Sequence, residues 1–222
     1  MALACSDKFA PKLILRKVTN LASDSRGTAA LEFAFVGPFL IAMLLAILYT
    51  SLVCLAQQML ETAAADAGRL LLTGQAQTAT LNGHTGMTSA DFKNVICNGA
   101  SGTNANGDSF TIPKLLPPLL SCSQLTVNVK TAASYNVSNG AAPTYTYDSN
   151  GVLTSTGTGY NTASGGSGQS KIVILQLIYL WPTLKGTLGL NLDNQPNANR
   201  MLVATSAFTT ENYSCSSSQT SC

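Results

Sequence analysis

The sequence has 222 residues and little net charge, because 12 lysine and arginine residues stand against 10 aspartate and glutamate residues. A net charge of +2 does not favour nucleic acid as a partner, since nucleic-acid-binding domains carry a clear basic excess. The single histidine excludes the paired-histidine motif of zinc proteases, and the G-x-S-x-G motif of serine hydrolases is absent. We therefore expect a protein that is not an enzyme, with no cofactor and no metal site.

The basic residues gather ahead of a long uncharged stretch. Five of them lie in the first 26 residues, namely Lys8, Lys12, Arg16, Lys17 and Arg26. After Glu32, 28 uncharged residues follow before Glu61. A membrane-spanning helix needs about 20 apolar residues, whereas apolar runs of about 10 to 14 are typical of a helix buried in a soluble core. We expect one transmembrane helix over residues 28–56, with a cytoplasmic N-terminus and an exported remainder, as the positive-inside rule predicts.

Glu32 lies at the edge of this predicted span. A carboxylate within a bilayer costs roughly 2.5 to 3.5 kcal/mol on insertion scales, so such residues usually have a functional role. A cleaved secretory signal is the alternative, but its apolar run is usually much shorter. Cleavage before Gln57 would also use Cys54-Leu55-Ala56, a poor small-residue site. Pro38 predicts a kink about one turn into the helix.

Beyond the span, the helical pattern turns amphipathic over residues 57–74. Its apolar residues recur three and four positions apart, as on one face of a helix: Met59, Leu60, Ala63, Ala64, Ala67, Leu70 and Leu71. Gly74 is a plausible stop signal. We predict one helix from Thr28 to Thr73, whose outer half packs on the exported domain or on neighbouring subunits.

Residues 75–222 are long enough for one exported domain with its own core. Ser89 is expected to cap a short helix over residues 91–96. Alternating or continuous apolar patterns predict three strands, at 125–130, 172–181 and 201–208. The second is apolar on both faces, as a central strand is, and Pro182 should end it. The predicted fold class is α+β, with a long N-terminal helix packed on a small antiparallel β-sheet.

Two stretches, 98–113 and 138–170, are rich in Gly, Ser, Thr and Asn. Flexible loops are the simpler interpretation, and a surface loop that meets a partner is the alternative. In the longer stretch, Tyr145 and Tyr147 are the side chains suited to such contact. His84 is expected in a solvated loop. The exported aspartates in turn-like sequence lack the calcium-loop pattern: Asp108, Asp148 and Asp193.

The six cysteines divide by their predicted compartment. Cys5 and Cys54 should be free. The four exported cysteines are free to oxidise and allow three pairings. We prefer the most local pairing, Cys97 with Cys122 and Cys215 with Cys222. A metal site is the rival, but the close cysteine pairs and histidines of zinc sites are missing.

The segment Gly27-Thr28-Ala29-Ala30-Leu31-Glu32-Phe33 resembles prepilins, which a prepilin peptidase cleaves after the glycine. Further pieces resemble TadE-type minor pilins (pseudopilins) of the tight-adherence (Tad, Flp-type) type IV pilus. These pieces are Arg26 to Ala34 with Pro38, Gln57-Gln58, Ala63 to Arg69, Phe92 to Cys97, Cys122 with the strand after it, Tyr179 to Pro182, and Phe208 to Tyr213. Between them they extend over most of the chain from Arg26 to Tyr213, whereas the long 138–170 segment departs from the pattern.

The resemblance implies a pilin-like fold and a subunit needed for pilus assembly, surface adhesion and biofilm formation. Residues 1–27 would be a basic leader, and Thr28 would become the new N-terminus. The implied partners are the prepilin peptidase, other minor pilins, the major pilin, the inner-membrane assembly platform and lipid. The exported domain would be periplasmic, or extracellular in the pilus. Glu32 would set helix registry by pairing with a Thr28 amine, and Phe33 would add helix packing.

Two readings of a different kind stay open. A membrane-anchored envelope protein or adhesin would use the helix as a tether and keep residues 1–27. An anchored periplasmic enzyme would depend on exported carboxylates, although no catalytic motif supports it.

Overall fold

In the computed structural model, the described residues are 27–104, 106–132, 145–149, 153–155, 159–160, 172–183, 192–195 and 198–210. The chain forms two compact units, Met1–Tyr49 and Thr50–Cys222, and one helix contributes residues to both. Most of the segment 138–170 lies outside the described residues.

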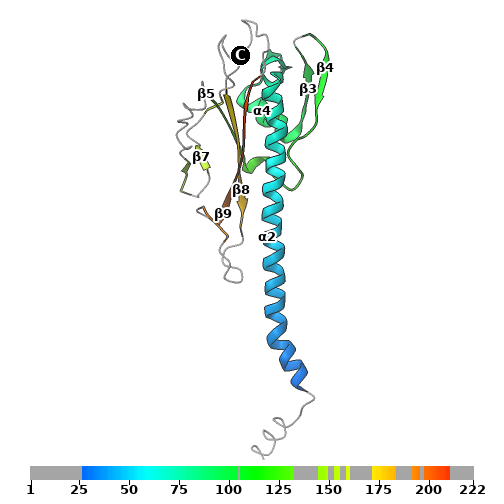
Figure 1. The fold of residues 1–222 in the computed structure, drawn as a ribbon, viewed down its shortest axis with the longest axis vertical. Coiled ribbons are helices and arrows are strands. Elements are labelled where there is room, and N and C mark those ends of the chain that lie inside the picture. Colours follow the sequence, from blue (N-terminus) through cyan, green and yellow to red (C-terminus); the bar gives the residue numbers. More distant parts are fainter. Residues whose placement is uncertain are drawn as a thin grey trace, which may run out of the picture. The chain divides into compact units, whose positions relative to one another are not determined.

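Helix α2 (Thr28–Leu72) has 45 residues and ends one residue before the predicted Thr73. Pro38 lies inside it, and the helix axis changes direction near its blue N-terminal end (Figure 1). Gly74 follows with a positive φ of 74°, a conformation that glycine adopts without the steric cost of a Cβ atom. The predicted stop at Gly74 is therefore confirmed, and the short helix α3 (Gln75–Thr78) begins directly after it.

The larger sheet of the second unit has three antiparallel strands in the order β5 (Leu125–Ala132), β8 (Ile172–Pro182) and β9 (Asn199–Thr209). The register between β8 and β9 runs without a break from Ile172↔Thr209 to Pro182↔Asn199. All three predicted strands are thus confirmed. The strand that is apolar on both faces, β8, occupies the centre of the sheet, as predicted.

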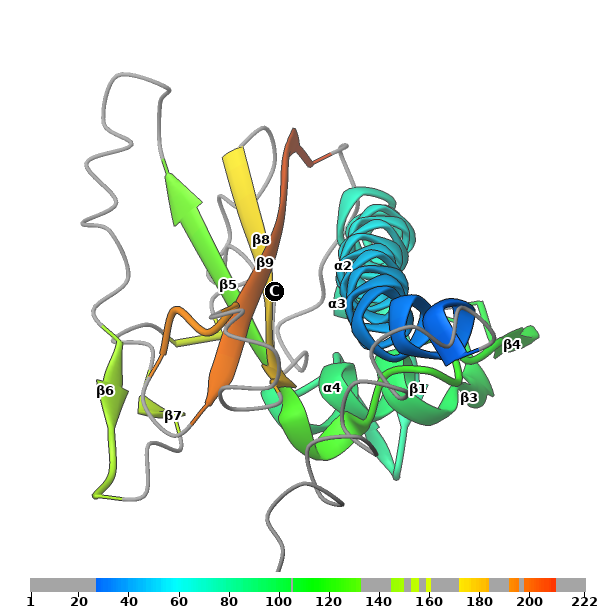
Figure 2. The same cartoon turned by 90° about the horizontal axis from the view of Figure 1, so that it is seen from below.

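One face of this sheet packs against the second half of α2 (Figure 2). The two elements approach closely at Gly68, where an added Cβ would lie 3.1 Å from Ser206 Oγ and 3.2 Å from Phe208 Cε1. Ala63, Ala64 and Ala67 of the same helix are buried. Small side chains let the helix backbone come near the strands, and the predicted packing of helix on sheet is confirmed.

The opposite face of the sheet is covered as well. Asn128 of β5 is 1% exposed and donates through Nδ2 to Gln176 Oε1 of β8 at 3.0 Å. The small hairpin of β6 (Thr146–Tyr147) and β7 (Leu153–Ser155) lies on this side, where the Tyr147 hydroxyl donates to Met201 Sδ at 3.8 Å. A polar side chain of β5 is therefore buried at Asn128 and hydrogen-bonded to the half-buried Gln176.

A second, four-stranded sheet has the order β2-β1-β3-β4. Its strands are β1 (Thr80–Leu81), β2 (His84–Thr85), β3 (Ala100–Thr103) and β4 (Ser109–Ile112). The prediction of a loop over 98–113 was wrong, because β3 and β4 pair along four residues each. Asn104 organises their turn, since its Oδ1 accepts from the backbone N–H groups of Asn106 and Asp108 at 3.0 and 2.8 Å.

Helix α4 (Ser89–Asn98) lies in sequence between β2 and β3 of this four-stranded sheet and buries Phe92, Val95 and Ile96. Its N-cap is Thr88, so the predicted cap at Ser89 was one residue late. The Thr88 side chain accepts from the Asp91 backbone, and the Asp91 side chain accepts from the Thr88 backbone. This reciprocal capping box satisfies two backbone donors at once, which the Ser89 alternative does not offer.

The outer edge of β9 is partly closed by other residues of the chain. The Asn199 carbonyl accepts from the backbone N–H groups of Asn194 and Gln195 at 3.2 and 3.1 Å. The Met201 N–H donates to Asn194 Oδ1 at 2.8 Å. Because alternate residues of a strand present their backbone groups to the same edge, these bonds occupy consecutive positions along it.

Candidate functional site

The segment predicted to be cleaved lies at the first residues of α2. Gly27 directly precedes the helix, and nothing lies within 4 Å of the position that a Cβ there would occupy. Thr28 is the first helical residue. Glu32 follows in the second turn with an exposed side chain. The three residues therefore lie on a short, accessible stretch at the start of the helix.

Phe33 follows Glu32 and is 76% exposed. Its ring lies against Gly37, where an added Cβ would be 3.5 Å from the ring carbons. The exposed apolar side chains continue along the helix: Leu31, Phe35, Val36, Phe39, Leu40, Ile41, Met43, Leu44, Leu45, Ile47, Leu48, Leu52 and Leu55. Such a surface is too large and continuous for a water-exposed helix.

Among the described residues, α2 is the one helix long and apolar enough to cross a membrane. A single N-terminal apolar helix of this kind fits a membrane anchor. Its side chains begin to be buried by the second unit at Val53, followed by Ala56 and Leu60. Cys54 lies at this transition and is exposed and free, as predicted.

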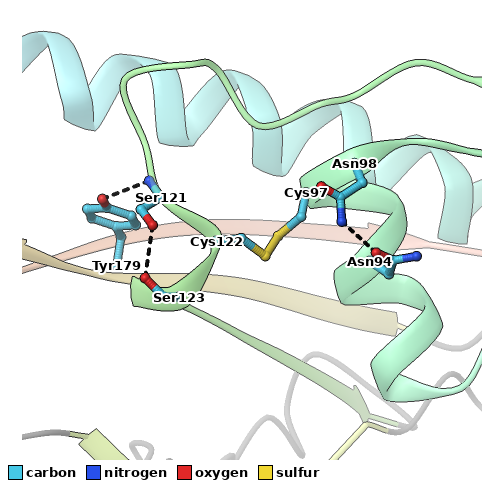
Figure 3. The surroundings of a disulfide bond; sticks show 7 residues. All are labelled: Asn94, Cys97, Asn98, Ser121, Cys122, Ser123 and Tyr179. Carbon is cyan, nitrogen blue, oxygen red and sulfur yellow. Dashed lines mark hydrogen bonds between the residues drawn. A yellow bond between two sulfur atoms is a disulfide. The ribbon is translucent and has the colours of Figure 1, made fainter.

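A disulfide joins Cys97 at the end of α4 to Cys122 in the 3₁₀ helix η2 (Cys122–Gln124), with Cα atoms 5.6 Å apart (Figure 3). The preferred pairing of these two cysteines is confirmed. The other predicted pair, Cys215 and Cys222, lies outside the described residues, as does Cys5. A disulfide is typical of an oxidising compartment.

The residues around the disulfide fix both of its ends (Figure 3). The Ser121 N–H donates to the Tyr179 hydroxyl of β8 at 3.0 Å, which ties η2 to the central strand. At the other end, Asn98 Nδ2 donates to Asn94 Oδ1 at 2.6 Å along α4. The disulfide therefore links α4 to the start of β5.

A polar cluster that the sequence reasoning missed lies at the start of α4. His84 belongs to β2 and is not a solvated loop residue, so that expectation was wrong. Its Nε2 lies 3.4 Å from Asp91 Oδ2. Asp91 also accepts from Asn82 Nδ2 at 2.9 Å and from the Thr88 N–H at 3.0 Å. The Thr-x-x-Asp spacing was the available signal for the cap.

The pKa of Asp91 lies below its ordinary value as the balance of opposing causes. Burial acts to raise this pKa, but the hydrogen bonds from the Thr88 side chain and backbone and from Asn82 lower it more. The nearby His84 lowers it further. These donors stabilise the carboxylate form over the neutral acid.

The remaining titratable groups form no metal site among the described residues, where no cluster of three or more His, Cys, Asp and Glu side chains occurs. Asp108 instead accepts from Asn104 Nδ2 at 3.1 Å within its turn. Burial raises the pKa of Tyr145, and burial followed by the charge of Tyr145 raises that of Tyr147.

The comparisons with known proteins concern the N-terminal helix. The family model for TadE-like proteins matches residues 27–69, from the glycine before α2 to Arg69 near its end. No curated protein and no solved structure matches the chain significantly. The resemblance read from the sequence is thus confirmed for this segment, and residues 27–69 are similar to TadE-like proteins.

Proposed function

We propose that this protein is a minor pilin (pseudopilin) needed for the assembly of a Tad/Flp-type IV pilus, and through it for surface adhesion and biofilm formation. The proposal rests on one observation, that the family match and the helix begin at adjacent residues. The TadE-like match begins at Gly27, the helix begins at Thr28, and the following turns expose almost only apolar side chains. A subunit released from its leader at this point would enter a helix bundle.

The proposed processing step is cleavage after Gly27 by a prepilin peptidase. The removed leader, residues 1–27, contains five basic residues, and Thr28 becomes a new N-terminal ammonium group. The open space around Gly27 supports this step, because a peptidase must surround the bond it cleaves. The apolar helix stays attached to the exported domain.

Glu32 is proposed to fix the stagger between neighbouring helices. Its carboxylate would pair with the Thr28 ammonium of a neighbour, or of its own chain, inside an apolar bundle. Such a pair offsets the cost of removing both charges from water, and its main contribution is registry rather than net stability. The exposed ring of Phe33 would pack between adjacent helices.

The proposed location is the bacterial inner membrane, with the exported domain in the periplasm or, after assembly, outside the cell. The disulfide between Cys97 and Cys122 supports export. The proposed partners are the prepilin peptidase, other minor pilins, the major pilin, the assembly platform and membrane lipid. We propose no catalytic activity and no cofactor.

The first test is the N-terminal sequence and intact mass of the protein recovered from its native membrane. The proposal expects a chain that begins at Thr28. A chain that begins near Met1 would favour an anchored envelope protein or adhesin, and a start at Gln57 would mean conventional secretion. Gly27→Leu should leave the leader attached, whereas the matched control Gly37→Ala, whose added Cβ would make only ordinary contacts, should be cleaved normally.

The role of Glu32 needs a separate test. Glu32→Gln should reduce co-purification with other pilins while leaving the exported domain folded, and Glu61→Gln is the matched control on the same helix. If Glu32→Gln left both processing and co-assembly unchanged, the registry role would be wrong.

A further inference from the structure

His84, the one histidine of the sequence, has a hydrogen-bond acceptor at each of its ring nitrogens. Nδ1 lies 3.1 Å from the Gly86 carbonyl oxygen, and Nε2 lies 3.4 Å from Asp91 Oδ2. A neutral imidazole carries one N–H and satisfies one of these acceptors, whichever tautomer it adopts. The imidazolium carries two and satisfies both.

We propose that His84 and Asp91 form a pH-sensitive latch, which fastens the β1–β2 hairpin to α4 when His84 is protonated and loosens when the proton leaves. This inference goes beyond pilus assembly and does not depend on it. Both latch residues lie in the second unit, Thr50–Cys222.

Asp91 is a fixed anion on the α4 side of the latch. Its Oδ2 accepts from the Thr88 N–H at 3.0 Å and the Thr88 hydroxyl at 2.5 Å, and its Oδ1 accepts from Asn82 Nδ2 at 2.9 Å. Its side chain is only 11% exposed, against 36% for His84. Because these donors keep the pKa of Asp91 below its ordinary value, the carboxylate stays charged throughout the range in which histidines titrate, near about pH 6.5.

Among the residues that the structure describes, one titratable side chain besides His84 interacts with Asp91. Tyr160 is the other titratable residue that interacts with Asp91, and burial together with Asp91 raises its pKa, so its phenol stays neutral. The polar pocket beside Asp91 is lined by described residues that do not titrate, apart from Asp91 itself: Leu81, Asn82, Asn94, Val95, Gly99, Ala100 and Ser101. Asp91 and Tyr160 therefore each keep one protonation state over the range in which histidines ordinarily titrate.

The latch joins α4 to the β1–β2 hairpin, which has few strand pairs. The hairpin pairs through only two residue pairs, Thr80↔Thr85 and Leu81↔His84, and its link to β3 is the single pair Thr80↔Thr103. A two-residue strand has little stability of its own. A change at one ion pair should therefore alter how often the hairpin opens.

Hydrogen exchange of the full-length protein in detergent micelles, at pH 5.0 and pH 8.0, tests the proposal. After correction for the intrinsic exchange rates, the backbone amides from His84 to Phe92 should be about twofold to fivefold better protected at pH 5.0, as for a partly exposed ion pair. Amides of the central strand β8 should show equal protection at both pH values. Equal protection of the hairpin at the two pH values would overturn the latch.

Two variants separate the latch from simple packing. His84→Gln keeps a polar side chain that does not titrate, and it should abolish the pH dependence. Asn82→Gly is the matched control, because glycine accepts the positive φ of 53° at this position and removes only the neutral hydrogen bond to Asp91. It should lower protection equally at both pH values and retain the pH dependence. Persistence of that dependence in His84→Gln, or in Asp91→Asn as a second variant, would refute the proposal.

Discussion

Gln57 of α2 donates through Nε2 to the backbone carbonyl of Val203 in β9, 3.0 Å away, across 146 positions of sequence. The same amide also donates to Glu61 Oε1 at 2.9 Å, one turn further along the helix. This bond joins the helix to the outer edge of the sheet near the place where the side chains of α2 begin to be buried. The Gln57 side chain thus fixes the position of α2, along its own axis, relative to β9.

Replacing Gln57 should weaken this junction. We expect Gln57→Ala to lower the free energy of unfolding by about 0.5 to 1.5 kcal/mol, the usual value of one partly buried hydrogen bond. Urea unfolding of the full-length protein in micelles, followed by tryptophan fluorescence, measures the change. Gln58→Ala is the control, because Gln58 is exposed, and an equal loss there would show that helix propensity rather than the bond is responsible.

The close approach at Gly68 should tolerate no branched side chain. With Ser206 Oγ only 3.1 Å from the position of an added Cβ, Gly68→Val should cost about 1 to 3 kcal/mol through overpacking. Combining it with Ser206→Gly should recover part of the loss, as measured by a double-mutant cycle of unfolding free energies. Ala65→Val on the exposed side of the helix should have little effect, and a comparable cost there would contradict the packing argument.

Breaking the disulfide should destabilise the second unit, Thr50–Cys222. In the chain-entropy model, closure of the 25-residue separation contributes about 3 kcal/mol. Under oxidising conditions, Cys97→Ser and Cys122→Ser should each lower the free energy of unfolding by this amount. After the disulfide of the wild type is reduced, the wild type and the variants should be equally stable. Cys54→Ser supplies the control, since Cys54 is free and its removal should leave the unfolding midpoint unchanged.

The N-cap of α4 predicts different stability losses at two adjacent residues, Thr88 and Ser89. Thr88→Ala should cost about 1 kcal/mol, the typical loss for an N-cap side chain, whereas Ser89→Ala should be close to neutral because Ser89 is already the first helical residue. Thermal unfolding of the two variants side by side provides the measurement. If Ser89→Ala were the more destabilising variant, Ser89 rather than Thr88 would be the N-cap.

Asp91 should also make the domain sensitive to acid. Since the pKa of Asp91 is lower in the folded than in the unfolded chain, its contribution to stability is complete above the unfolded value, about 3.9. That contribution is lost as the pH falls through the folded value. Urea midpoints between pH 5 and pH 2 should therefore fall more steeply for the wild type than for Asp91→Asn. Parallel slopes would mean that Asp91 is not preferentially ionised in the folded state.

The long helix and strands could be predicted from the sequence, because their apolar periodicity persists over many residues. Helix α2 and strands β8 and β9 are long, and each carries a pattern that only one kind of element can bury. The 97–122 disulfide followed from proximity in the chain. The proposed roles of Gly27 and Glu32 rest on a motif, and both residues are exposed.

The features that the sequence did not reveal are short or depend on packing. Ser109–Ile112 does alternate polar and apolar residues, but over four positions this pattern is also common in loops. His84 and Asp91 meet only because the β1–β2 hairpin turns back toward α4, and no periodicity reports such a contact. Asn128 is buried because Gln176 lies opposite it in the register, and a pair of this kind is invisible until the register is known.

The hydrogen bonds along the first half of β9 bear on the resistance of the protein to aggregation. An open strand edge recruits strands from other molecules and begins aggregation. The Asn199 and Val203 carbonyls and the Met201 N–H are already bonded from within the chain, so an incoming strand would find fewer free backbone groups on that stretch. Edge-to-edge pairing is thereby disfavoured there.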